Sequence, residues 1–85
     1  DLVAEVYDRI TAHGDAALFI RQTRDRADAE ARAARERLRA GNPVSLLDGV
    51  PLAWKDLFDL KGTVTTAGSA VLKGSAPAVA DAALV

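Results

Sequence analysis

Apolar residues recur at helical spacing in two segments of the chain. Near the start, Leu2, Val6 and Ile10 lie four residues apart, which places them on one face of a helix that Gly14 would end. A second segment, residues 25–40, consists mostly of Ala, Arg and Glu and is followed by a Gly-Asn-Pro stop signal. The first half of the chain is therefore predicted to contain two helices.

The second predicted helix has a narrow apolar face, which consists of Ala27, Ala31, Ala34 and Leu38. Because alanine offers little area at about 25 cal/mol per Å², this helix can approach a neighbour closely but gains little from burial. Arginines are dense on its other faces, but acids stand at pairing distance and no aromatic residue accompanies them. We therefore expect an ion-paired solvent face rather than a nucleic-acid contact.

Shorter apolar runs predict β-strands. Residues 16–20 (AALFI) are typical of a buried strand, although a helix end would show the same pattern. Asp48-Gly49 predicts a turn, and residues 52–54 form a second strand candidate that ends at Lys55. The β-branched run at 63–66 favours a third strand or an extended loop. Helices and strands together indicate an α/β fold class.

The last residues resemble the first turn of another helix. Asp81 is a candidate N-cap or first-turn acid for a helix that starts near Ala82. Only about one turn follows, which is too short to be stable by itself. We therefore expect residues 1–85 to be a piece of a larger protein, poorly folded in isolation.

Composition narrows the kind of chemistry. The 85 residues carry a net charge of -1, so bulk charge favours neither nucleic acid nor an anionic membrane as a partner. The chain has no cysteine and one histidine, His13, so we expect no metal site and no other cofactor. No apolar run approaches the roughly 20 residues that cross a bilayer, and the first residues lack a secretory pattern. We expect a cytoplasmic protein without a membrane partner.

Lys55 has two interpretations. As a structural residue, it would extend its ammonium to water or pair with Asp56 or Asp59. As a functional residue, it would be enclosed by its apolar neighbours, which would disfavour the charged form and leave a neutral amine as a base. Its position at the end of a predicted strand suits a site, because binding groups collect at that edge of α/β sheets.

The loop after Lys55 is rich in hydroxyl groups and glycine: Thr65, Thr66, Gly68 and Ser69. These residues could satisfy a tight turn, or they could line a pocket beside the lysine. Their spacing fits neither of the glycine-rich phosphate-binding patterns, GxxxxGK[ST] and GxGxxG, so we do not expect nucleotide binding. No serine of the chain lies in a GxSxG elbow with histidine and aspartate partners.

Three ordered blocks in the second half of the chain resemble the amidase signature family. The run LDGVPLAWKDLFDLKGTVTTAGSAVLKG contains a G-[IV]-P-x-x-x-K-D block and then a TTxGS block, and PAVADAALV matches a P-x-x-D-A-x-x-V helix start. The earlier predicted helices and the Gly-Asn-Pro turn also fit the family. The resemblance covers nearly the whole chain, and the ordered combination is more specific than any single block.

The resemblance implies a catalytic role for Lys55. This lysine matches the catalytic lysine of the family, which works in a Ser, cis-Ser, Lys triad rather than with histidine and aspartate. Both family serines belong to a Gly/Ser-rich block that follows residue 85, so Ser69 is not assigned as the nucleophile. The resemblance also implies that residues 1–85 are the N-terminal part of a single amidase domain, with a large mixed sheet and helices on both faces.

The leading hypothesis is an amidohydrolase that cleaves a carboxamide C–N bond through an acyl-serine intermediate, with a small-molecule amide as substrate. Its fold and activity would need the remainder of its own chain, and the 85 residues alone should be inactive; a homodimer is compatible with the sequence. One alternative is the A subunit of a tRNA-dependent amidotransferase, which would have partner chains and would contact tRNA. A third is a non-catalytic α/β interaction module in which Lys55 is structural.

Overall fold

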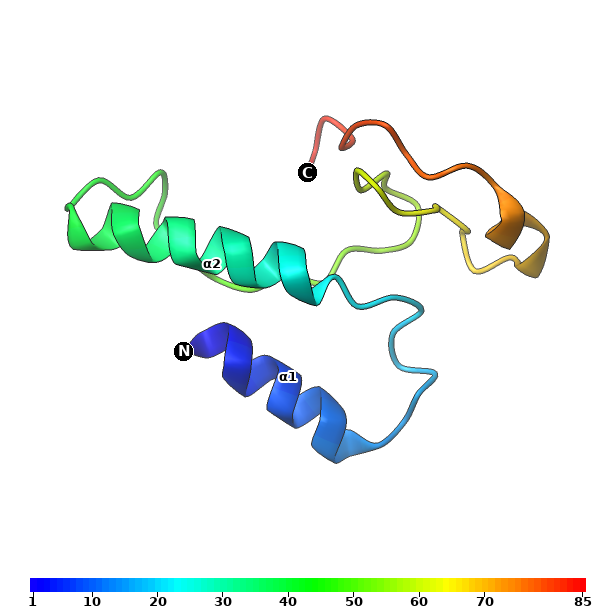
Figure 1. The fold of residues 1–85 in the computed structure, drawn as a ribbon, viewed down its shortest axis with the longest axis horizontal. Helices are drawn as coiled ribbons and strands as arrows, with labels where there is room; N and C mark the ends of the chain where they lie inside the picture. Colours follow the sequence, from blue (N-terminus) through cyan, green and yellow to red (C-terminus); the bar gives the residue numbers. More distant parts are fainter. The chain divides into compact units, whose positions relative to one another are not determined.

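The structure, a computed structural model, describes residues 1–85 and contains two α-helices and one short 3₁₀ helix (Figure 1). These are α1 (Leu2–His13), α2 (Arg24–Arg39) and η1 (Ala70–Gly74). The chain divides into two compact units, Asp1–Leu52 and Ala53–Val85. The first unit holds both α-helices, and the second holds Lys55 and the loop that follows it.

Helix α1 begins and ends where its sequence indicates. The Asp1 carboxylate accepts a hydrogen bond from the Val3 backbone N–H at 2.9 Å, which satisfies one of the free donors of the first turn. Gly14 ends the helix with a φ of 75°, a left-handed conformation that glycine adopts without a Cβ penalty. The predicted helix and its glycine cap are confirmed.

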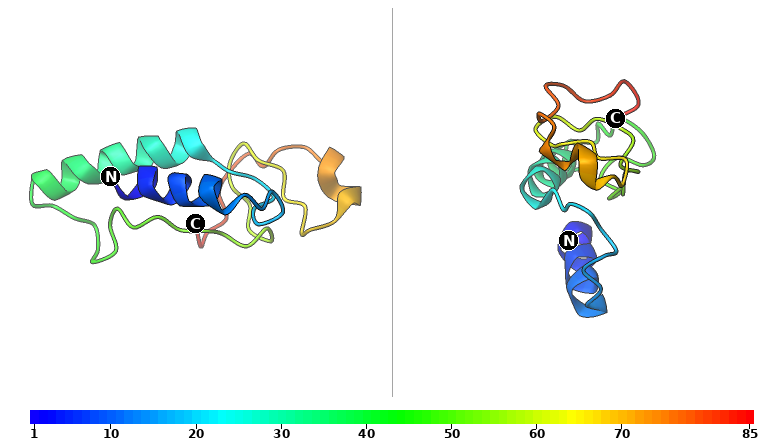
Figure 2. Two further views of the ribbon diagram at one scale, coloured as in Figure 1. Left: turned by 90° about the horizontal axis from the view of Figure 1, so that it is seen from below. Right: turned by 90° about the vertical axis from the view of Figure 1, so that its right-hand side faces the viewer.

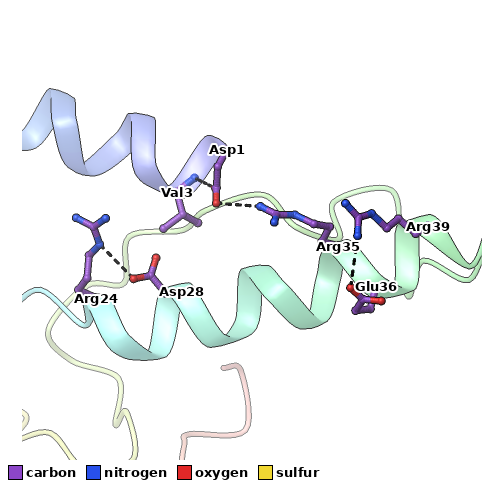
Figure 3. Close-up of polar contacts among 7 residues, drawn as sticks. All are labelled: Asp1, Val3, Arg24, Asp28, Arg35, Glu36 and Arg39. Carbon is purple, nitrogen blue, oxygen red and sulfur yellow. Dashed lines mark hydrogen bonds and ion pairs between the residues drawn. The ribbon is translucent and has the colours of Figure 1, made fainter.

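Helix α2 is the second predicted helix, displaced by a single residue at each end. Its exposed face carries the ion pairs Arg24–Asp28, Arg26–Glu30 and Arg39–Glu36 along the helix. Arg35 reaches the Asp1 carboxylate at 3.0 Å and so joins α2 to the start of α1 (Figure 3). Three of these ion pairs join residues three or four positions apart, as the spacing of arginines and acids predicted, and the Arg35–Asp1 pair joins the two helices.

The core of the first unit is very small. Helix α1 lies beside α2 in each view (Figures 1 and 2), and the buried hydrophobic residues are Val3, 5% exposed, and Ala34, 3% exposed. Ala34 lies on the predicted alanine face, but Leu38, at the end of that face, is 51% exposed. The alanine face therefore permits close approach and buries little area, as expected from its composition.

The strands predicted at residues 16–20 and 52–54 are wrong for these residues, and the run at 63–66 forms a loop, the other of its two predicted forms, because the structure contains no β-strand. A strand requires a partner whose backbone completes its hydrogen-bond ladder, and turns and side chains take the backbone groups instead. In residues 16–20, the Leu18 N–H bonds to the Asp15 carbonyl at 3.2 Å. In residues 63–66, the Thr63 N–H bonds to the Leu60 carbonyl at 3.0 Å. The mixed sheet expected for the α/β fold class is therefore not formed here.

The helix predicted to start near Ala82 is also absent. The Asp81 carboxylate accepts a hydrogen bond from the Lys61 N–H at 2.8 Å, and no helix follows it. The Val85 N–H bonds to the Ala82 carbonyl at 2.9 Å, which makes a turn. A single turn does not repay the entropic cost of starting a helix, so the segment is held by the loop at Lys61.

A membrane-spanning helix is defined by its length and its apolar composition. No helix in the structure has both the length and the apolar character that a membrane crossing requires.

Candidate active-site segment around Lys55

Lys55 lies in a tight turn at the beginning of the second unit. Its backbone carbonyl accepts hydrogen bonds from the Leu57 N–H at 2.7 Å and the Phe58 N–H at 3.2 Å. The rings of Trp54 and Phe58, on either side of the turn, meet edge to face with centroids 5.8 Å apart. Two backbone hydrogen bonds and one ring contact thus define the local conformation of the lysine.

The Lys55 side chain is exposed, so the predicted enclosure by apolar neighbours is wrong for these residues. Trp54 and Phe58 pack against each other rather than around the ammonium, and Leu57 is 56% exposed. The side chains of residues 53–58 therefore do not enclose the Lys55 side chain.

Asp56 joins the lysine turn to the threonine-rich loop. Its backbone carbonyl accepts a hydrogen bond from the Ala67 N–H at 2.9 Å. Its carboxylate accepts from the Thr66 N–H at 3.2 and 3.1 Å and from the Thr66 hydroxyl. Thr66 is 6% exposed and is the buried polar residue of the chain. The residue next to Lys55 is therefore held through both its main chain and its side chain.

A second contact between an aspartate and a threonine continues this pattern. The Thr65 hydroxyl donates to the Asp59 carboxylate at 2.6 Å, and the Asp59 carbonyl accepts from the Ala82 N–H at 2.9 Å. The Gly62 N–H bonds to the Ala78 carbonyl, and the Ala78 N–H bonds to the Thr63 carbonyl, both at 2.8 Å. These contacts bring the three sequence blocks, KD, TTxGS and PxxDA, together in one unit.

Ser69 has a local structural role in this arrangement. Its hydroxyl accepts from the Val71 N–H at 3.3 Å and caps η1, and its own N–H bonds to the Thr66 carbonyl at 2.8 Å. The two preceding residues, Ala67 and Gly68, have φ values of 51° and 75°. The hydroxyl thus stabilises the loop, as expected for a serine that is not the nucleophile.

The sequence suggests Asp56 and Asp59 as ion-pair partners of Lys55 and does not indicate their threonine contacts. In the structure, the Asp56 carboxylate binds Thr66 and the Asp59 carboxylate binds Thr65. The sequence does contain a signal for this arrangement, a D-x-x-D pair followed by adjacent threonines. No group of three or more His, Asp or Glu side chains is placed to hold a metal ion.

The first unit contains an open groove of about 460 Å³. Its walls are mostly apolar and come from α1, α2 and residues 48–52. Tyr7 lies in it with the Arg24 guanidinium 4.4 Å from its ring centre, and burial, more than any charge nearby, raises the pKa of the tyrosine. Lys55 and the TTxGS block are not among the residues that line this groove, so we do not assign it to catalysis.

Comparison with known proteins agrees with these blocks. The family model described as Amidase matches residues 1–85. The A subunit of the glutamyl-tRNA(Gln) amidotransferase of Anaeromyxobacter sp. (strain K) is 47% identical over 78 residues, which are 91% of this chain and 16% of that protein. The corresponding protein of Myxococcus xanthus (strain DK1622) is 49% identical over 59 residues, 69% of this chain and 12% of that protein.

A solved structure is also similar to this chain. It comes from work described as "An unexpected vestigial protein complex reveals the evolutionary origins of an s-triazine catabolic enzyme". The TM-score is 0.75 with 35% identity over 95% of this chain and 19% of the other. The chain belongs to the amidase family, and it spans less than a fifth of the length of these relatives.

Proposed function

We propose that these residues form the N-terminal part of a cytoplasmic amidase, in which Lys55 is the base of a Ser, cis-Ser, Lys triad. The observation that supports this most strongly is the family match over residues 1–85, which includes the K-D block at Lys55. In this proposal the chain supplies one member of the triad, and both serines come from residues that follow Val85. The 85 residues alone should therefore be inactive.

The proposed reaction begins with proton transfer. The neutral amine of Lys55 takes a proton from the cis-serine hydroxyl, which takes one from the nucleophilic serine as that serine attacks the amide carbonyl. The C–N bond breaks, the nitrogen leaves with a returned proton, and water hydrolyses the acyl-serine. For this chemistry the exposed Lys55 must be enclosed by the rest of the protein, within the mixed sheet that we propose for the complete domain.

The first prediction tests the role of Lys55. In the full-length protein, Lys55→Ala should lower the rate of simple amide hydrolysis by at least about a thousandfold, because a triad acts as a unit. Lys73→Ala removes another exposed lysine and is the matched control, with an expected rate close to wild type. Hydrolysis of a primary amide is followed by ammonia release. An unchanged rate in Lys55→Ala would exclude Lys55 as the base.

A second candidate function is supported by the identity of the relatives. The relatives in Anaeromyxobacter and Myxococcus are both A subunits of glutamyl-tRNA(Gln) amidotransferases. In this role, the enzyme would release ammonia from glutamine and pass it to a charged tRNA, and it would require partner subunits. Copurification of a second protein chain or of tRNA with the full-length protein would favour this function over a free-standing amidase.

A full-length sequence without paired serines would instead favour a non-catalytic module.

A further inference from the structure

We infer that Asp56 and Thr66 form a positioning pair that holds the Lys55 turn against the 65–69 loop and so fixes the direction of the lysine side chain. This inference rests on the proposed catalytic role of Lys55. Neither residue is assigned to the chemical step, because each acts on the backbone beside Lys55.

Asp56 binds two consecutive residues of the loop, Thr66 and Ala67. The Asp56 carboxylate binds the main chain and the hydroxyl of Thr66, and the Asp56 carbonyl binds the next N–H, that of Ala67. The hydroxyl oxygen of Thr66 also accepts a hydrogen bond from the Gly68 N–H at 3.2 Å. Thr66 is buried, so its hydroxyl and its N–H would be costly to leave without a hydrogen-bond partner.

Within residues 53–85, side-chain contacts join the Lys55 turn to the loop that follows it. This unit contains η1 and no strand, so no ladder hydrogen bonds inside the unit hold the backbone at Lys55. The Lys55 carbonyl bonds only within its own turn, to residues 57 and 58. The link to the next loop that lies nearest to Lys55 along the chain passes through Asp56, and the Asp59–Thr65 contact at 2.6 Å follows it. A displacement of about 1 Å at a reacting group can cost about a hundredfold in rate.

The experiment compares threonine variants in the full-length protein. Thr66→Val keeps the shape and removes the hydroxyl, and Thr66→Ser restores a hydroxyl at the same position. Thr63→Val is the matched control, because the half-buried Thr63 donates its hydroxyl to the Leu60 carbonyl at 2.9 Å, away from Lys55. The kcat and KM for a primary amide are measured together with the number of active sites, by titration with an acylating reagent.

A positioning role predicts a loss of turnover at each site. For Thr66→Val, kcat per titrated site should fall about 10-fold to 100-fold with KM changed less than about twofold. Thr66→Ser should recover most of the rate, and Thr63→Val should keep the wild-type rate per site. A purely structural role would lower the number of titrated sites and leave kcat per site unchanged, which would overturn the inference.

Two further variants separate this inference from the proposed function. If Thr66→Val does not fold, Asp56→Asn keeps the side-chain shape and weakens the same bonds, so kcat per site should again fall. In a Lys55→Ala background, Thr66→Val should cause no further loss, because its effect acts through the lysine. If the rate losses of Lys55→Ala and Thr66→Val were additive in the double variant, Thr66 would not act by positioning Lys55. An active Lys55→Ala variant would instead reject the proposed function itself.

Discussion

At the scale of single residues, a strong polar contact in the first unit is the ion pair between Arg37 and Asp48. Arg37 binds Asp48 through two parallel hydrogen bonds, from Nε at 2.8 Å and from Nη2 at 2.7 Å. The Asp48 side chain is only 4% exposed and also accepts from the Val44 N–H at 3.2 Å. The hydrogen bonds from Arg37, with a smaller contribution from the Val44 amide, lower the pKa of Asp48 from 3.8 to about 2.

The lowered pKa predicts a change of stability in acid. Because the folded protein binds the proton of Asp48 less readily than the unfolded chain, this stabilisation is complete above pH 3.8 and is lost as the pH falls towards about 2. Thermal unfolding of the full-length wild type and of its Asp48→Asn variant should therefore differ most near pH 5 and converge near pH 2. A constant difference between the two proteins over this range would contradict the prediction.

At the scale of elements, α2 lies against the turn at Asp48-Gly49. Gly49 has a φ of 90°, and a Cβ at this position would lie 3.6 Å from the Ala34 Cβ and 3.7 Å from the Leu38 side chain. The turn was predictable from Asp48-Gly49, and the small residue on α2 from the alanine face. Their contact was not predictable, because it depends on how the chain returns along the helix.

A substitution on α2 tests this packing. In the full-length protein, Ala34→Leu should lower the free energy of unfolding by about 1–3 kcal/mol, because Ala34 is 3% exposed and the larger side chain must displace the neighbours that cover it. Ala29→Leu places the same side chain on an exposed position of the same helix and should change stability by less than about 0.5 kcal/mol. Urea denaturation of the two variants measures both values. Equal effects would mean that the turn does not pack against α2.

On the scale of the whole molecule, these residues bury too little to be stable alone. Large apolar side chains such as Leu46, Leu52 and Val79 are more than 70% exposed, whereas the buried hydrophobic residues are Val3 and Ala34. Ordering the backbone costs about 1 to 2 kcal/mol of conformational entropy per residue. The small buried apolar area of these residues offsets little of this cost.

The isolated 85-residue chain should for this reason lack a cooperative thermal transition. Its circular dichroism signal at 222 nm should decrease gradually with temperature, with helical signal from α1 and α2 at most. The full-length protein, measured in parallel, should unfold cooperatively. A sigmoidal transition of the isolated chain, equal by different probes, would contradict this expectation.

The sequence by itself determined the two helices, the glycine that ends α1, the turn at Asp48-Gly49 and the family blocks around Lys55. These features are local, since each depends on residues within a few positions of one another. Only the tertiary structure decided the partners of Asp48, Asp56 and Asp59, the absence of strands and the exposure of Lys55. Hydrogen-bond partners, ladder formation and burial depend on which distant segments meet, and spacing along the chain does not specify that.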